Sequence, residues 1–380
     1  MYFDAVVVGA GFTGSTIAER LASRFDQTVL IIDRRDHIGG NAYDEHNRDG
    51  ILVHKYGPHI FHTNSERVWR YLSQFTEWRP YEHHVLGSVE GALVPIPFNF
   101  NTLRMLFPEV MARRLEEKLV ACYGFGGRVP ILKLRESDDA EVKELAQYVY
   151  KHVFESYTRK QWGLEPDELS PHVTARVPVR LSRDDRYFQD TYQAMPADGY
   201  ARLFRRLLHH PNIRLMLNTD YRDIESDVGC DAIYYTGPID EYFNYRYGPL
   251  PYRSLRFDVR TEGRDRHQPV GTVNYPCQYD YTRITEQKHL TGQKSQVTTL
   301  VYEYPRAHTP GETEPYYPIP RDETKCIYAK YRQAARKLDG KVTFCGRLGG
   351  YQYYNMDQAV ATALANVERT RKEAVEARAV

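Results

Sequence analysis

The sequence has few cysteines, and their arrangement excludes two classes of scaffold. Five cysteines occur in 380 residues, and no two of them form a C-x-x-C pair. Disulfide-bonded scaffolds and structural zinc sites need dense or paired cysteines, so the sequence predicts neither of them and no metal site. The cysteines are odd in number and widely spaced, at Cys122, Cys230, Cys277, Cys326 and Cys345.

An excess of charge of one sign is also absent. Lysine and arginine total 51 against 50 acidic residues, which gives a formal net charge of +1. A nucleic-acid-binding protein usually has a basic excess, so this balance argues against nucleic acid as a partner. Any anion site in this chain must therefore be local.

The sequence has no long hydrophobic run of the kind that crosses a membrane. Near the N-terminus, the uncharged stretch 5–18 is interrupted by three glycines, and the first residues, MYFD, lack the positive charge of a signal peptide. We therefore expect a cytosolic protein without a membrane span. The length of 380 residues exceeds the usual size of one hydrophobic core and predicts two or three packed units.

The strongest pattern in the sequence is a glycine-rich turn between a predicted strand and a predicted helix. Gly9, Gly11 and Gly14 form a G-x-G-x-x-G pattern inside VVVGAGFTGSTIAERLA. A second apolar strand, TVLII, ends at Asp33, which follows Gly14 by 19 residues. At this spacing a carboxylate contacts the ribose of a bound dinucleotide. Because all these features occur in the right order, the sequence predicts a dinucleotide site.

Further glycines favour FAD over NAD as the dinucleotide. A second glycine turn at Gly39–Asn41 indicates a further contact with a larger ligand. The late segment CGRLGG places Arg347 after a strand, at the start of a helix that would favour an anion or an electron-rich ring. The pair Arg34 and Arg35 leaves NADP open as an alternative, since two arginines suit a 2′-phosphate, although the preceding acid disfavours it.

The texture of the sequence predicts an α/β protein with a Rossmann-like FAD-binding domain, an inserted helical domain and an antiparallel β-sheet domain. In the helical part, Asp138 and Glu141 are spaced as a capping box. In the sheet part, alternation predicts a strand over residues 279–285. The predicted FAD-binding domain comprises 1–80, 194–242 and 324–380, the helical domain 99–165, and the sheet domain, which would hold substrate, 81–98, 166–193 and 243–323.

Two histidines follow a Gly-Pro turn in KYGPHIFHTN. His59 and His62 lack a nearby third ligand, which disfavours a metal site. They either lie against the flavin ring or serve as a structural pair.

Aromatic residues gather near the end of the predicted long helix, in FESYTRKQWG. For Phe154, packing in the core is a plausible role. Tyr157 and Trp162 stand at a helix-to-loop junction, where exposed rings more readily stack on a base or sugar.

Arginines supply the candidates for a second ligand. A guanidinium grips phosphate in a bidentate manner, and two such groups near a flavin would imply a substrate that carries a pyrophosphate. Most arginines are solvated surface residues, so we expect only some of the candidates to bind the substrate. The candidates are Arg176, Arg180, Arg183, Arg186 and Arg283.

The chain resembles the bacterial UDP-galactopyranose mutases from residue 2 to about residue 365. The resemblance implies interconversion of UDP-galactopyranose and UDP-galactofuranose without net redox change. It also implies reduced FAD acting through N5 as a nucleophile on the sugar, with formation of a flavin–galactose adduct, and a homodimer. The matching segments include VVGAGFTGSTIAERLA, DRRDHIGGNAYD, YGPHIFHTN, YTRKQWG, ARVPVRLSRDDRYF, NYPCQYDYTRITE and GRLGGYQYYNMD.

The resemblance also implies roles for individual residues. Arg176 and Arg283 would hold the pyrophosphate, and His59 and His62 would line the flavin face. Asp33 is a departure, because related flavoproteins more often have glutamate there. The predicted substrate-binding residues are Phe154, Tyr157, Thr158, Trp162, Tyr187, Asn274, Tyr316 and Tyr351. The predicted cofactor-binding residues are Gly9, Gly11, Phe12, Thr13, Gly14, Asp33, Arg34, Gly40, Asn41, His59, Arg347 and Asp357.

Two rival hypotheses remain at this point. The glycine scaffold alone also suits an amine-oxidase-like flavin oxidoreductase. The arginines and tyrosines suit a protein that senses a UDP-sugar and keeps FAD for structure. The combination of the glycine turns with those arginines and tyrosines favours the mutase.

Overall fold

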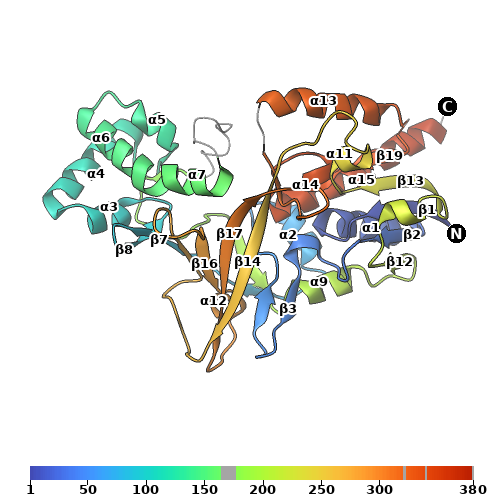
Figure 1. The fold of residues 1–380 in the computed structure, drawn as a ribbon, viewed down its shortest axis with the longest axis horizontal. Coiled ribbons are helices and arrows are strands. Elements are labelled where there is room, and N and C mark those ends of the chain that lie inside the picture. Colours follow the sequence, from blue (N-terminus) through green and yellow to red (C-terminus); the bar gives the residue numbers. More distant parts are fainter. Residues whose placement is uncertain (164–176, 320–321, 339, 379–380) are drawn as a thin grey trace. The chain divides into compact units, whose positions relative to one another are not determined.

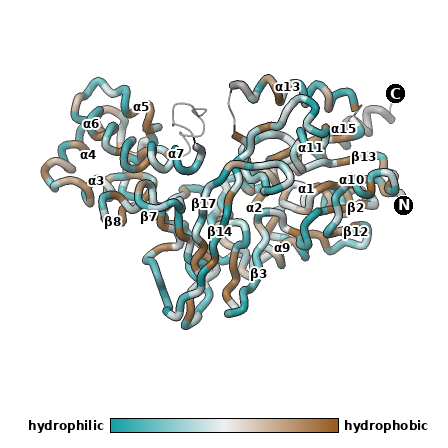
Figure 2. The backbone as a smooth tube through the Cα atoms, in the orientation of Figure 1, coloured by the Kyte–Doolittle hydropathy of each residue, from teal (hydrophilic) through white to brown (hydrophobic). Residues whose placement is uncertain are grey.

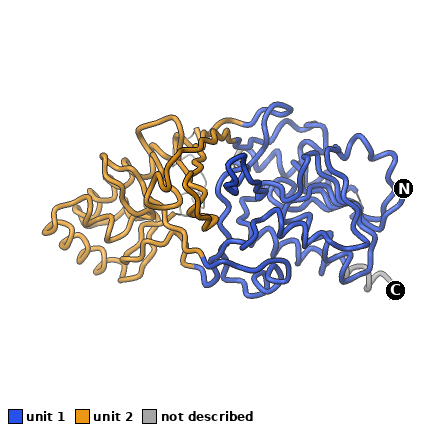
Figure 3. Tube along the Cα trace, turned by 90° about the horizontal axis from the view of Figure 1, so that it is seen from below, with its two compact units in different colours: residues 1–80, 190–254, 308–380 blue, residues 81–189, 255–307 orange. Residues whose placement is uncertain are grey.

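The computed structural model describes residues 1–163, 177–319, 322–338 and 340–378 (Figure 1). The chain forms two compact units, coloured separately in Figure 3. Unit 1 comprises residues 1–80, 190–254 and 308–380, and unit 2 comprises residues 81–189 and 255–307. Unit 1 contains the three segments of the predicted FAD-binding domain, and the division of the remainder into a helical and a sheet domain stays a prediction.

Unit 1 is built on a five-stranded sheet in the order β12-β2-β1-β13-β19. Every pairing in it is parallel, so the carboxyl ends of the strands meet at one edge. The strand β2 is buried along its whole length, as expected for the interior of a parallel sheet. This arrangement confirms the predicted Rossmann-like fold. The strands are β1 (Tyr2–Val8), β2 (Val29–Ile32), β12 (Ile213–Met216), β13 (Gly229–Tyr235) and β19 (Val342–Phe344).

The helix α1 (Phe12–Phe25) begins directly after the first glycine turn and packs along the sheet and against α15 (Met356–Arg378) (Figure 1). Ile17, Ala18 and Leu21 are buried on it, at the spacing expected for one helical face. In two smaller sheets, β11 pairs with both β5 and β6, and β3 pairs with β4.

The other elements of unit 1 lie between these strands and helices in the chain. Its remaining strands are β3 (Asp44–His46), β4 (Leu52–His54), β5 (Phe61–Thr63), β6 (Trp78–Pro80), β11 (Tyr192–Pro196) and β18 (Tyr317–Pro318). Its remaining helices are η1 (Gly40–Ala42), α2 (Glu66–Leu72), α9 (Tyr200–Leu207), α10 (Tyr221–Ile224), α11 (Ile239–Tyr242), α13 (Asp322–Arg336) and α14 (Gly346–Gly349).

Unit 2 contains a helical layer with its own hydrophobic core. Hydrophobic and hydrophilic residues alternate along α4 and α6 in Figure 2, as expected for helices with one buried face. The cap of α6 is Asp139, whose carboxylate accepts from the backbone N–H groups of Glu141 and Val142, so the predicted cap at Asp138 is wrong by one residue. The helices are α3 (Phe100–Leu106), α4 (Glu109–Tyr123), α5 (Ile131–Arg135), α6 (Ala140–Val149), the π-helix η2 (Tyr150–Glu155) and α7 (Ser156–Trp162).

The sheet of unit 2 is mixed, because β15 pairs in parallel with β7 while β16 is antiparallel to both of its neighbours. Residues 279–282 lie in a turn that precedes β16, so the strand predicted over 279–285 begins only at Arg283. The strands are β7 (Val85–Val89), β8 (Ala92–Ile96), β15 (Thr272–Asn274), β16 (Arg283–Glu286), β17 (Thr298–Ala307) and most of β14 (Tyr252–Glu262). The described part of the unit also contains the short pair β9 (Arg128–Val129) and β10 (Val179–Arg180) and the helix α12 (Gln287–Thr291).

No helix in the described part of the chain is both long and apolar enough to span a bilayer.

Candidate functional site

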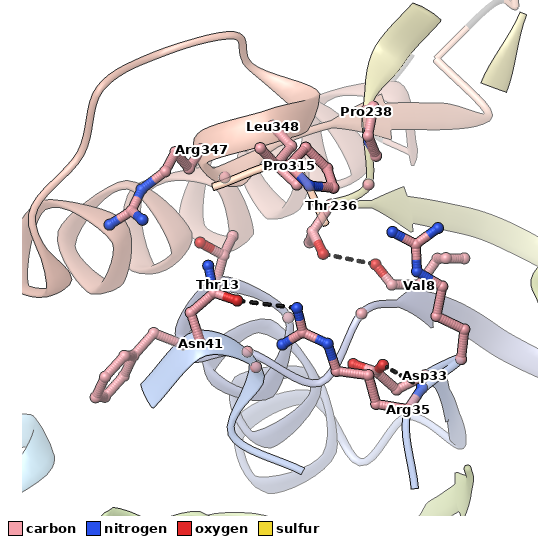
Figure 4. Close-up of a pocket in the computed structure, with 18 of the residues that line it drawn as sticks. Val8, Thr13, Asp33, Arg35, Asn41, Thr236, Pro238, Pro315, Arg347 and Leu348 are labelled. Atoms are coloured by element: carbon pink, nitrogen blue, oxygen red, sulfur yellow. Dashed lines mark hydrogen bonds between the residues drawn. The ribbon is translucent and has the colours of Figure 1, made fainter. Parts of the chain in front are cut away.

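A pocket in unit 1 opens at the carboxyl ends of β1, β2 and β13 (Figure 4). Parallel sheets bind ligands at this edge, next to the N-termini of the helices that follow. Eleven of the twelve predicted cofactor-binding residues line the pocket, as does Tyr316. The eleven are Gly9, Gly11, Phe12, Thr13, Gly14, Asp33, Arg34, Gly40, Asn41, His59 and Arg347.

Close approaches of the backbone explain the glycines of this pocket. Gly9 has φ +103°, which side-chain-bearing residues rarely adopt. A Cβ atom on Gly14 would lie 1.9 Å from the carbonyl oxygen of Gly9, and one on Gly40 would lie 2.9 Å from the Cα of Gly11. No side chain caps α1 at Gly11, so its first N–H groups are available to an anion.

Asp33 is fixed at the end of β2 by hydrogen bonds on both carboxylate oxygens. The N–H of Ala10 donates to Oδ2 at 2.8 Å, and the N–H of Arg35 donates to Oδ1 at 3.0 Å. The side chain is 9% exposed. Since each carboxylate oxygen accepts two hydrogen bonds, Asp33 retains capacity for the hydroxyl groups of a ribose.

Two arginines and two glutamates balance their charges along one wall of the pocket. Arg34 lies 3.3 Å from Glu241 and 3.5 Å from Glu314, and Arg35 donates to Glu314 at 2.9 Å. Burial would raise the pKa of Glu314, but Arg35 and Arg34 outweigh it and hold that pKa below its ordinary value. Arg35 also extends across the pocket to donate to Asn41 (Figure 4). Both arginines are therefore already engaged, which disfavours the NADP alternative.

The pocket contains functional-site candidates that the sequence did not suggest, namely Glu241 and Glu314. They are 73 positions apart in the chain. They approach Arg34 only because α11, which carries Glu241, and the segment before β18, which carries Glu314, return to the same edge of the sheet. No local spacing in the sequence signals this contact.

The two predicted histidines have different surroundings. His59 lines the pocket, and its Nδ1 lies 2.9 Å from the carbonyl oxygen of Gly57, which places the proton on that nitrogen. The backbone of His59 is held by His54 Nδ1, which accepts its N–H at 3.1 Å, and by the hydroxyl of Tyr200, which donates to its carbonyl. Burial and the neighbouring His59 lower the pKa of His54 to about 3, so His54 is neutral.

His62 lies on β5 and does not line the pocket. Its Nδ1 is 2.9 Å from Oδ2 of Asp190, which lies two residues before β11, the strand that pairs with β5. In the described segments, no three His, Cys, Asp or Glu side chains gather closely enough to hold a metal ion.

Arg347 and Tyr316 are joined at the C-terminal side of the pocket. Arg347 donates to the carbonyl oxygens of Tyr316 at 3.3 Å and Tyr354 at 2.7 Å. Its guanidinium carbon lies 4.5 Å from the ring centroid of Tyr317. These contacts hold Tyr316 at the pocket lining, where the structure brings a predicted substrate residue together with the predicted cofactor residues.

The side chains of two further predicted residues, Tyr351 and Asp357, form hydrogen bonds within the protein. The Tyr351 hydroxyl lies 2.8 Å from the carbonyl oxygen of Pro251 and 3.1 Å from that of Ile319, and the side chain is buried. Asp357 is not part of the pocket lining and accepts from the hydroxyl of Thr63 at 2.9 Å. Its other oxygen, Oδ1, is buried and has no hydrogen-bond partner among the described residues.

In unit 2, Arg283 and Asn274 face each other across β16 and β15. Arg283 is bound to Glu303 on β17 through two hydrogen bonds, of 2.9 and 2.8 Å. Asn274 Oδ1 is buried and finds no hydrogen-bond partner within the described chain. The guanidinium of Arg283, held in place by Glu303, thus belongs to the residue directly opposite Asn274, whose buried oxygen has no described partner. This arrangement suits a polar ligand. Arg176 lies outside the described residues.

The remaining predicted substrate residues lie on or near the end of the helical layer. Phe154 is part of the buried helical core, which agrees with a packing role. Tyr157, Thr158 and Trp162 are half-buried on α7. Tyr187 is half-buried, and its N–H donates to the carbonyl oxygen of His83 at 2.6 Å.

The sequence of the chain is similar to those of two nucleotide-sugar mutases. The family profile described as UDP-galactopyranose mutase matches residues 152–353, and a profile for NAD(P)-binding Rossmann-like domains matches residues 7–75. A probable UDP-galactopyranose mutase from Klebsiella pneumoniae is 38% identical, with 96% of this chain and 94% of that protein covered. A dTDP-fucopyranose mutase from Escherichia coli is 35% identical, with 94% and 96% covered. A crystal structure of reduced UDP-galactopyranose mutase has a TM-score of 0.75 at 15% identity, covers 98% and 94% of the two chains, and supports the fold.

Proposed function

Because the chain belongs to the UDP-galactopyranose mutase family, we propose that it interconverts UDP-galactopyranose and UDP-galactofuranose, with reduced FAD as its cofactor. The observation that carries this proposal is the 38% identity to a probable UDP-galactopyranose mutase over 96% of the chain. A relative of similar identity acts on dTDP-fucopyranose, so the sugar and the base are the finer parts of the proposal.

The residues of the unit 1 pocket fit FAD. The glycine turns and the uncapped start of α1 suit its pyrophosphate, and Asp33 suits the ribose of its adenosine. Outside the pocket lining, Oδ1 of Asp357 is a buried acceptor that no described residue uses, while its Oδ2 accepts from Thr63. Reduced FAD bound here would supply an electron-rich nitrogen as the nucleophile for the sugar.

The role we propose for Arg283 is to stabilise the charge of the departing nucleoside diphosphate. Expelling UDP leaves negative charge on the pyrophosphate, and a fixed guanidinium lowers the energy of that state without reorganising. Glu303 fixes the plane of Arg283 through its two hydrogen bonds. Keeping UDP bound also favours its recapture by the rearranged sugar. Arg176 would share this role.

The pocket lining adds two further assignments. Tyr316 would donate its hydroxyl to the phosphate or sugar, since Arg347 holds its backbone at the pocket. His59 would lie on the flavin face with its Nδ1 proton held by Gly57 and would present Nε2 to the ligand.

The proposal is tested by chromatography of the sugar nucleotides formed under anaerobic, reducing conditions. UDP-galactose and dTDP-fucopyranose are supplied in parallel to the purified full chain. We expect a furanose product from UDP-galactose at the higher kcat/KM. A preference for the dTDP sugar would overturn the choice of substrate, oxygen uptake with an amine would favour the oxidase, and tight UDP-sugar binding without conversion would favour the sensor.

A further inference from the structure

Arg180 is a buried arginine for which the described part of the chain supplies no ion-pair partner. The residue is 6% exposed and lies on β10 in unit 2. No carboxylate among the described residues forms an ion pair with it, and its Nε is buried without a hydrogen-bond partner there. Burying a charge in this way costs free energy that hydrogen bonds must offset.

The hydrogen bonds that the guanidinium of Arg180 makes with described residues all go to one short segment of backbone. Nη1 donates to the carbonyl oxygen of Arg186 at 2.7 Å, and Nη2 donates to that of Tyr187 at 2.6 Å. The planar fork of arginine suits two successive carbonyls, whereas the single ammonium of lysine does not span them in the same way. Arg180 thereby closes the turn that leads from β10 to Tyr187.

Tyr187 is consequently held on both sides of its α-carbon. Its N–H donates to the carbonyl oxygen of His83 at 2.6 Å, and its own carbonyl accepts from Arg180. The anchor itself is fixed, because the N–H of Arg180 donates to the carbonyl oxygen of Phe98 at 2.8 Å. The ring of Tyr187 packs edge-on against Phe188, with centroids 4.9 Å apart.

The neighbouring arginines show that this use is specific to Arg180. Arg183 pairs with Glu116, and Arg186 pairs with Asp184 and Glu82. These side chains are 36% to 44% exposed, as is usual for surface ion pairs of modest stability. Arg183 therefore serves as a matched control three residues along the chain.

We propose that Arg180 is a positioning residue, which orients Tyr187 for contact with the nucleotide sugar by gripping the two carbonyl groups beside it. The proposal rests on the function proposed above, in which Tyr187 binds substrate. The two side-chain hydrogen bonds of Arg180 both end on the backbone next to Tyr187, so we expect its contribution to turnover to pass through Tyr187.

A double-mutant cycle separates positioning from general support of the fold. Arg180→Met and Tyr187→Phe are measured singly and together for kcat and KM with UDP-galactose, with Arg183→Met as the control. We expect each single variant to lower kcat/KM by about tenfold or more and the double variant to lose little beyond the worse single one. Losses that multiply, or a normal kcat/KM for Arg180→Met, would overturn the proposal.

Two further measurements cover the remaining outcomes. Arg180→Lys keeps the charge and one of the two contacts, so it replaces Arg180→Met in the cycle if the latter does not fold, and we expect a smaller loss from it. Amide hydrogen exchange over residues 183–189 measures the protection of this backbone independently of enzyme activity. We expect faster exchange in the Arg180 variant but not in Arg183→Met. An unchanged exchange rate in the Arg180 variant would contradict the positioning role of Arg180. If the wild-type chain converts neither sugar, the proposed function is wrong. The exchange measurement would still test whether Arg180 holds the backbone at Tyr187.

Discussion

Arg283 and Glu303 stand directly opposite each other on adjacent antiparallel strands, and two hydrogen bonds join them side by side. The side chain of Glu303 is 2% exposed, whereas that of Arg283 is 25% exposed. The carboxylate is therefore the buried anchor, and the guanidinium is the end accessible to a ligand.

Replacing Arg283 should affect turnover far more than cofactor binding. We expect Arg283→Lys to lower kcat by about a hundredfold, because lysine keeps the charge but loses the planar fork that Glu303 aligns. The measurement is steady-state turnover with reduced enzyme, alongside flavin content by absorbance. The control is Arg260→Lys, since Arg260 pairs with Asp258 on the exposed part of β14. Turnover within twofold of wild type would contradict the role of Arg283.

Alanine variants of two glycines with similar backbone angles can distinguish loss of cofactor contact from backbone strain. Gly40 and Gly50 have φ +55° and +75°, but only a Cβ on Gly40 would meet other atoms, 2.9 Å from the Cα of Gly11. Both alanine variants should lose about 1 kcal/mol of stability from the left-handed backbone. Only Gly40→Ala should lose bound FAD, as measured by the ratio of flavin to protein absorbance. Equal flavin content in the two variants would argue against a cofactor at this turn.

The cofactor should be needed in reduced form without being consumed. The purified protein should be yellow and should bleach with dithionite. Because substrate and product are isomers, product should accumulate in excess of a limiting amount of dithionite under anaerobic conditions. Product that never exceeds the reductant would contradict an isomerisation.

His54 should make the free energy of unfolding depend on pH in the acidic range. The pKa of His54 is about 3 in the folded chain against an ordinary 6.5, so above pH 6.5 neither the folded nor the unfolded form is protonated. As the pH falls from 6.5 toward 3, only the unfolded form binds the proton, and stability should fall by up to about 1.4 kcal/mol per pH unit.

Urea unfolding across this pH window tests the expectation. In His54→Asn, an amide oxygen still accepts the N–H of His59 but does not titrate, so the loss of stability on acidification should be smaller than in wild type. His209→Asn is the control, because His209 is exposed. A slope unchanged in His54→Asn would show that His54 is not responsible.

Local patterns were enough to predict the Rossmann-like part of the fold and eleven residues that line one pocket in it. Gly9 and Asp33 are separated only by the glycine turn, α1 and β2, which follow one another in the chain. Their spacing can therefore be interpreted without knowledge of any distant contact. The pairing of Arg283 with Glu303 was not predictable, because it depends on the register of β16 against β17.

Two local errors also have physical causes. Alternating residues predicted a strand over 279–285, but the N–H of Tyr275 donates to the carbonyl oxygen of Thr282, which closes a turn around Tyr279 and Tyr281. Their rings stack at 4.8 Å instead of alternating with the sheet. At the start of α6, two adjacent aspartates competed for the cap, and only Asp139 accepts the N–H groups of the first turn.

The balanced wall formed by Arg34, Arg35, Glu241 and Glu314 has a consequence for redesign of the cofactor preference. Adding arginines would not adapt this pocket to a dinucleotide with an extra phosphate, because the present guanidinium groups are already neutralised. The effective change is to remove an acid. Loss of Glu314 would take away the carboxylate that Arg35 pairs with, while Arg34 would keep its ion pair with Glu241.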